Sequence, residues 1–208
     1  MNPQTIKFIA TIFSMKSEIK LIFFTLGVIC LLPVFAVLII TQAGINIVSG
    51  SLISYNPQTS QVEIHDPKTG EVVDHVDQTS MWPVSGPVSL EFGSLKSPFQ
   101  PFHTGIDIAS YDHQVGDPVR AFMKGTVIYA GQTSSGYGKH VIIDNGHFVT
   151  SVYSHLDAIG VSEGDKVDAG SVIGLRGTTG WSTGPHLHLE IRVFSIPVNP
   201  RVFLNGDP

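Results

Sequence analysis

The sequence predicts an all-β fold, a small antiparallel β-sandwich or barrel, that follows a single N-terminal transmembrane helix. Two observations lead to this prediction. Residues 21–41 form an apolar run without a charged side chain. From Met81 onward, short strand-like segments alternate with Gly, Asp, Ser and Pro turns about every 8–12 residues, and no helical period of useful length appears.

Composition narrows the class of protein. The chain has 208 residues, a formal net charge of −5, and a charged fraction of 14%, whereas soluble domains average about 25%. The fraction is low partly because no charged residue lies between Lys20 and Glu63. The mild acidity argues against a nucleic-acid-binding protein, which needs a basic patch. The single cysteine, Cys30, excludes an intramolecular disulfide framework and a four-cysteine metal site.

The apolar run has the length of a membrane anchor. About 20 apolar residues in a helix span the hydrocarbon core of a bilayer. Lys7, Lys16 and Lys20 precede the run, and no Lys or Arg follows it until Lys68. By the positive-inside rule, residues 1–20 stay in the cytoplasm, residues 21–41 span the cytoplasmic membrane once, and the remainder is extracytoplasmic.

A cleaved signal peptide, ending near Thr41-Gln42-Ala43, is the alternative for this segment. The apolar run exceeds the 7–15 residues of a signal-peptide core, and a 20-residue leader precedes it. Both features favour the uncleaved anchor.

Residues 42–80 are rich in Gly, Ser, Asn and Gln and predict an extracytoplasmic stalk with little to bury. Inside it, two alternating runs flank Asp66-Pro67-Lys68-Thr69-Gly70, which predicts a β-hairpin over 62–76. His65 and His75 are interpreted as solvated hairpin residues rather than metal ligands.

Residues 81–208 are long enough for one folded core. Eight strands are expected in this domain: Val88–Phe92, Thr104–Ala109, Val119–Phe122, Thr126–Tyr129, His140–Asp144, Phe148–Leu156, Ser171–Leu175 and His186–Val193.

The last of these strands places histidines on one face. Because successive side chains in a strand point to opposite faces, Leu187 and Leu189 face the core while His186, His188 and Glu190 share the other side. Two imidazoles so placed are able to meet one ion or one substrate. Taken alone, a His-x-His pair on a solvated face is weak support for a site.

A second segment, His103-Thr104-Gly105-Ile106-Asp107, puts a histidine and a carboxylate on one strand face with only a glycine between them. Two imidazoles and one carboxylate form a three-ligand catalytic zinc site with water in the fourth position. The spacing does not decide which of His186 and His188 completes it. A third histidine, His155, ends a strand and is expected to share a face with Tyr153.

Together these motifs give a specific resemblance, which covers nearly all of residues 81–201. The chain resembles the lysostaphin-type (LytM-like) zinc endopeptidases of bacterial cell walls. The matching motifs are Trp82-Pro83-Val84, Phe92-Gly93, His103-Thr104-Gly105-Ile106-Asp107, Gly125-Thr126-Val127, Gly136-Tyr137-Gly138, Tyr153-Ser154-His155-Leu156, Gly177-Thr178-Thr179-Gly180, Ser182-Thr183-Gly184-Pro185-His186-Leu187-His188-Leu189-Glu190 and Val198-Asn199-Pro200.

The resemblance implies roles for five residues. His103, Asp107 and His188 would bind one Zn²⁺ per chain, and His155 and His186 would be catalytic histidines beside it. The implied activity is hydrolysis of peptide cross-links or bridges of peptidoglycan, with peptidoglycan peptides as substrate and residues 21–41 as the contact to the membrane. The alternative is a non-catalytic LytM-like module that binds the wall or activates another wall hydrolase. It is disfavoured because all five positions are filled.

The other histidines of the domain are interpreted without a catalytic role. His147 is expected in a turn, His113 in a loop, and His140 on a strand surface. Gly-rich and Ser/Thr-rich loops at Thr133–Gly138 and Thr178–Gly184 are expected to frame a groove.

Overall fold

The structure is a computed structural model that describes residues 2, 4–5, 17–79, 81–94 and 102–208, without the side chains of 18 and 33–42. It divides into two compact units, residues 1–44 and 45–208. The first holds most of helix α2 (Ser17–Leu52). Among the residues whose side chains are described, no helix is long and apolar enough to cross a membrane. The expected span 21–41 includes 33–41, whose side chains lie outside the described residues, and it stays a prediction.

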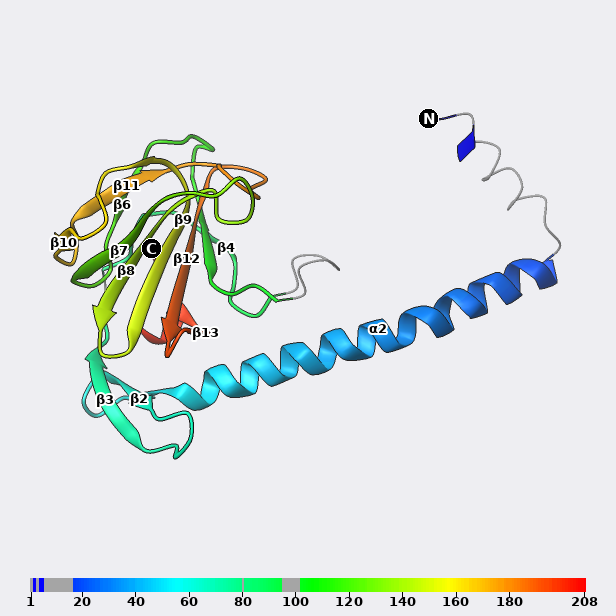
Figure 1. Cartoon of the computed structure of the whole chain (residues 1–208), viewed down its shortest axis with the longest axis horizontal. Coiled ribbons are helices and arrows are strands. Elements are labelled where there is room, and N and C mark those ends of the chain that lie inside the picture. Colours follow the sequence, from blue (N-terminus) through cyan, green and yellow to red (C-terminus); the bar gives the residue numbers. More distant parts are fainter. Residues whose placement is uncertain (1, 3, 6–16, 80, 95–101) are drawn as a thin grey trace. The chain divides into compact units, whose positions relative to one another are not determined.

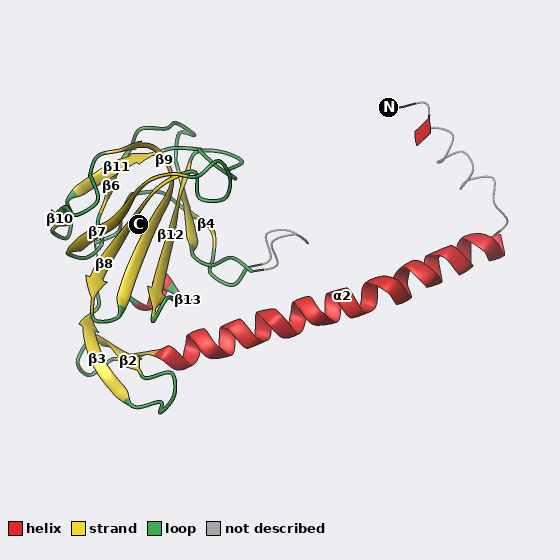
Figure 2. Cartoon of the chain, in the orientation of Figure 1, coloured by secondary structure: helices red, strands yellow, loops and turns green. Residues whose placement is uncertain are grey.

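The second unit is built almost entirely of strands and loops (Figure 2). The bounds of its elements are β1 Ile53–Asn56, β2 Gln61–His65, β3 Val72–Asp77, β4 Val88–Leu90, β5 Ile106–Ala109, β6 Pro118–Arg120, β7 Gly125–Gln132, β8 Lys139–Gly146, β9 Val149–Ile159, β10 Lys166–Val167, β11 Val172–Arg176, β12 His186–Val193, β13 Ile196–Val198 and the 3₁₀ helix η1 Pro200–Val202.

The larger sheet holds ten strands within the described residues, and seven of them form a continuous path in the order β10-β7-β8-β9-β12-β5-β4 (Figure 1). In addition, β11 pairs with β6 and β9, and β13 pairs with β12. All of these ladders are antiparallel. Each of the eight predicted strands overlaps one observed strand, so the antiparallel all-β prediction is confirmed.

Strand β12 is central because it pairs with β9 on one side and β5 on the other. Its predicted apolar face is confirmed: Leu187, Leu189, Ile191 and Val193 are all fully buried. The opposite face is also covered, since Glu190 is 0% exposed and His188 only 5%. The polar face predicted from alternation is therefore a buried one.

The predicted hairpin exists as β2 and β3 joined through Asp66–Gly70, and β1 adds a third strand. The expectation that this segment buries little is wrong, because Val62 and Ile64 are fully buried and belong to the main core cluster. Ser49 donates a hydrogen bond to the Pro197 carbonyl, and Gln78 to the Val202 carbonyl. Residues 45–79 thus pack as part of the second unit, while the domain boundaries at 20/21, 41/42 and 80/81 stay predictions.

Candidate metal centre and flanking histidines

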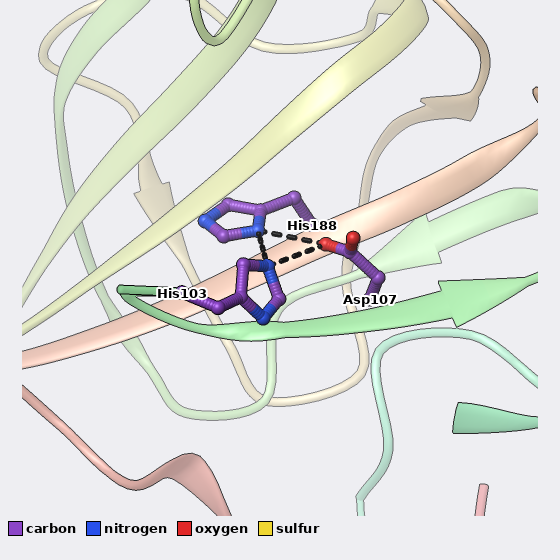
Figure 3. A group of neighbouring side chains, drawn as sticks. All are labelled: His103, Asp107 and His188. Atoms are coloured by element: carbon purple, nitrogen blue, oxygen red, sulfur yellow. Dashed lines mark hydrogen bonds and ion pairs between the residues drawn. The ribbon is translucent and has the colours of Figure 1, made fainter. Parts of the chain in front are cut away.

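Three ligand-type atoms, two from neighbouring strands and one from the segment before β5, converge on one point (Figure 3). The register of β5 and β12 sets Asp107 directly opposite His188, and His103 comes from the segment just before β5. Asp107 Oδ1 lies 3.0 Å from His103 Nε2 and 2.8 Å from His188 Nδ1. The two ring nitrogens are 3.0 Å apart, and all three residues are buried.

The electrostatics of this trio favour a charged carboxylate. Burial by itself would raise the pKa of Asp107, but hydrogen bonds from His103 and His188 outweigh it and lower the pKa well below the usual range. Burial would lower the pKa of His188, whereas its contacts with Asp107 and Glu190 raise it. Asp107 is therefore ionised and faces two imidazoles that share one oxygen.

This donor set fits a zinc ion. Two imidazole nitrogens and one carboxylate oxygen are the ligands that Zn²⁺ prefers in catalytic sites. At metal–ligand distances of about 2.0–2.1 Å, tetrahedral ligands lie about 3.3 Å apart, so the observed triangle needs to open by a few tenths of an ångström. On its far side, His103 donates from Nδ1 to the Glu91 carbonyl at 3.0 Å, which leaves Nε2 as the ligand atom.

His155 reaches this cluster through a β-bulge. Between Tyr153 and Leu156, β9 advances three residues while β8 advances two, from Val141 to Lys139. His155 itself has φ +63°, in the left-handed region. Strict alternation would put it on the same face as Tyr153, as the sequence predicted, and Tyr153 is fully buried in the core. The bulge instead brings its ring centroid to 4.7 Å from that of His186, and bulges beside functional sites commonly redirect a side chain in this way.

His186 and His155 are each oriented by a backbone carbonyl. His155 donates from Nδ1 to Thr179 O at 2.8 Å, and His186 from Nδ1 to Gly184 O at 2.8 Å. His186 Nε2 lies 3.6 Å from Asp107 Oδ2. Burial, with a smaller effect of the His186 charge, lowers the pKa of His155 to about 4. Both histidines border the cluster of His103, Asp107 and His188, and each has a defined tautomer.

The two predicted groove loops meet backbone to backbone. A Cβ atom on Gly138 would lie 2.5 Å from the carbonyl carbon of Thr179, and one on Gly180 would lie 2.4 Å from the Gly136 carbonyl oxygen. Both glycines also have positive φ. Only glycine fits at these positions, and the contact fixes the two loops to each other.

Two pockets flank the cluster of His103, Asp107 and His188. One has an aromatic wall formed by Phe102, Tyr137 and Trp181 and opens onto His155 and His188. The other is lined by small and polar residues: Ser89, Leu90, Asp107, Ala109, His113, Thr183, Gly184, Pro185 and His186. The cluster therefore lies between a recess with an aromatic wall and a second recess whose lining contains no Phe, Tyr or Trp, an arrangement suited to an extended ligand.

The remaining histidines lie mainly where the sequence predicted. His147 is in the β8–β9 turn with φ +54°, and His113 is exposed in a loop. The expected surface position of His140 is wrong: it is 5% exposed and stacks on Tyr129 with ring centroids 4.5 Å apart. The His65 ring contacts Ser54 Oγ and Gly70 O, and His75 is exposed in β3.

Sequence reasoning placed Glu190 on the histidine face but gave it no role. In the structure its carboxylate accepts hydrogen bonds from Thr104, Tyr137 and Arg192. Burial would raise its pKa, but contacts with His188, Arg192 and Thr104 lower the pKa to about 2. The signal was present in the alternation of β12, because a carboxylate two residues after a ligand histidine shares its face.

Comparisons with known proteins identify the family of the domain that carries this cluster. The model of peptidase family M23 matches residues 101–200. The catalytic domain of the prophage-encoded M23 protein EnpA of Enterococcus faecalis is 34% identical, with a TM-score of 0.51 over 59% of this chain and 96% of that domain.

Two curated relatives are similar over the same region. The DD-carboxypeptidase/endopeptidase Mpg of Neisseria meningitidis is 47% identical over 98 residues, which are 47% of this chain and 22% of Mpg. The murein hydrolase activator NlpD of Escherichia coli is 37% identical over 126 residues, which are 61% of this chain and 31% of NlpD. The chain thus spans about a fifth to a third of the length of these relatives.

Proposed function

Because the chain belongs to peptidase family M23, we propose that it is a membrane-anchored zinc endopeptidase that hydrolyses peptide cross-links or bridges of peptidoglycan. The observation that carries this proposal is the convergence of His103, Asp107 and His188, with His155 and His186 beside them. Three protein ligands leave one tetrahedral position for water, as in catalytic rather than structural zinc sites.

The ion, when bound by His103 Nε2, Asp107 Oδ1 and His188 Nδ1, supplies a Lewis acid that polarises a carbonyl and lowers the pKa of a water to about 7. The protein supplies the proton transfers. The Thr179 carbonyl holds the Nδ1 proton of His155, so that its Nε2 exchanges protons with water or substrate. His155 and His186 together provide a general base and a donor for the negative charge that develops on the carbonyl oxygen.

The groove and the chain's location support a wall peptide as substrate. The two loops that carry Gly138 and Gly180 consist mostly of Gly, Ser and Thr residues, so an extended peptide of small residues can approach their backbones closely. The lysine bias before residue 21 supports an extracytoplasmic position for residues 42–208 on the cytoplasmic membrane. Peptidoglycan lies on that side of the membrane.

The test is digestion of purified peptidoglycan by the zinc-loaded full chain, with fragments identified by mass spectrometry. We expect new peptide termini from the wild type and almost none from Asp107→Ala. His75→Ala is the matched control, since His75 is exposed in β3, and should cleave like the wild type. A wild-type chain that binds zinc and releases no fragments would refute the endopeptidase proposal.

The similarity to an activator of murein hydrolases favours one alternative function. In that case the chain would release no fragments by itself but would raise the rate of a second wall hydrolase added to the same digest. The Asp107→Ala variant separates the two functions: stimulation that survives this substitution does not need the metal site, whereas endopeptidase activity does.

A further inference from the structure

The two ring nitrogens of His188 have different surroundings. Its Nδ1 faces Asp107 and His103, as the metal ligand would. Its Nε2 is buried and makes no hydrogen bond with the described residues. A neutral imidazole that binds a metal through Nδ1 carries its proton on Nε2. A buried N–H group without an acceptor is unfavourable, so the bound state of His188 needs an acceptor at this position.

Glu190 is placed to be that acceptor. Its Oε2 lies 3.5 Å from His188 Nε2, a distance that a shift of about half an ångström turns into an ordinary hydrogen bond. The side chain is fully buried and is held from several directions. Arg192 Nε donates to Oε1, while Tyr137 and Thr104 donate their hydroxyl protons to Oε2.

These contacts restrict the motion of the carboxylate and connect it to the aromatic pocket and to the segment that carries His103. Arg192 also donates from Nη2 to the Tyr137 hydroxyl at 3.0 Å, so Glu190, Arg192 and Tyr137 form a closed triangle. Tyr137 belongs to the aromatic wall of the pocket, and Thr104 follows the ligand His103 directly. A carboxylate held in this way has little freedom to leave His188.

We propose that Glu190 is a positioning residue that accepts the Nε2 proton of His188 and thereby fixes the ring with Nδ1 toward the metal. Partners of this kind raise the basicity of a ligand histidine and set its tautomer, and their loss typically weakens metal affinity about 10–100-fold. The inference rests on the proposed metal site of His103, Asp107 and His188.

Two variants of the full chain test this role through zinc affinity, measured by competition with a chelator. Glu190→Gln removes the charge and puts an amide NH₂ among groups that donate hydrogen bonds. Glu190→Asp keeps the charge but withdraws the carboxylate by one methylene, so it separates positioning from simple attraction of a cation. We expect both variants to bind zinc about 10–100-fold more weakly.

Asp117→Asn is the control, because Asp117 likewise pairs with an arginine, Arg176, and has no hydrogen bond or ion pair to the proposed ligands in the described structure. It should bind zinc like the wild type. The melting temperature of each variant, measured without metal, shows how much of a loss in zinc affinity follows from a loss of stability. Zinc affinity of Glu190→Asp equal to that of the wild type would overturn the positioning role, whatever Glu190→Gln does.

A measurement on the wild type keeps the proposal open to refutation if the variants fail to fold. In the zinc-loaded chain, a nitrogen–proton NMR correlation of the imidazoles should show the proton of His188 on Nε2. A proton on Nδ1 would overturn the proposal. A wild-type chain that binds no zinc would instead refute the metal site itself, so the two failures are distinguishable.

Discussion

The left-handed backbone at His155 predicts that glycine is more stable than alanine at this position. His155→Ala and His155→Gly both remove the imidazole and its 2.8 Å hydrogen bond to Thr179, so these losses cancel in the comparison. The remaining difference in unfolding free energy comes from the backbone conformation at this position. Alanine at φ +63° destabilises the folded state by about 1–2 kcal/mol, because its Cβ disfavours the left-handed conformation. Glycine destabilises it by about 0.4–1 kcal/mol, because its unfolded chain has more conformational freedom to lose.

The difference favours His155→Gly over His155→Ala by about 1 kcal/mol, equivalent to about 2–4 °C in melting temperature for a chain of this size. The opposite order is expected in a regular part of the same strand. At Thr150, which is not among the residues with positive φ, glycine should be less stable than alanine by about 0.5–1 kcal/mol.

Urea unfolding of the four variants, followed by the fluorescence of the two tryptophans, measures both differences. The protein should be metal-free, because any zinc bound by the native state would add its own stabilisation. If His155→Ala is as stable as His155→Gly, or more stable, then His155 is not held in the left-handed region, and the bulge does not deliver it to the site.

Three further predictions concern the metal and the topology. His155→Ala and His186→Ala should keep near-normal zinc content while losing about 10²–10⁴-fold in cleavage rate; zinc loss measured on the same preparations would make that histidine a ligand. Metal analysis of Asp107→Ala should show far less than the one zinc per chain expected for the wild type, and unchanged zinc content would remove Asp107 from the ligand set. Protease added to intact spheroplasts should digest residues 42–208; a protected domain would contradict the topology, and release into the medium without detergent would indicate cleavage of the leader.

The sequence predicted well what depends on local pattern. The alternation of Leu187, Leu189 and the intervening histidines predicted strand β12 with its observed bounds, His186–Val193. The turn residues Asp66–Gly70 predicted the hairpin, where Asp66 Oδ1 accepts hydrogen bonds from the amides of Lys68 and Thr69. Both features follow from neighbours in the chain.

Features that depend on pairing between distant segments were harder to predict. The register that sets Asp107 against His188 is a property of two strands about 80 residues apart, and the choice of ligand histidine came from the family resemblance. The extra residue in β9 leaves no periodic signature, so alternation predicted that His155 shares a face with Tyr153, and only the resemblance placed it beside the metal. Likewise, alternation in the hairpin could not show that Ile64 has a core to pack against.

The groove contains positions that tolerate substitution and positions that do not, and the contact between Gly138 and Gly180 belongs to the second kind. A methyl group at either glycine would collide with main-chain atoms, so substitution there forces the loops apart and widens the groove. The next residue along, Trp181, is 69% exposed, and its side chain can be exchanged without moving the backbone. A search for variants with a changed ligand preference should therefore vary Trp181 at the rim and keep Gly138 and Gly180, because this pair fixes the distance between the two loops.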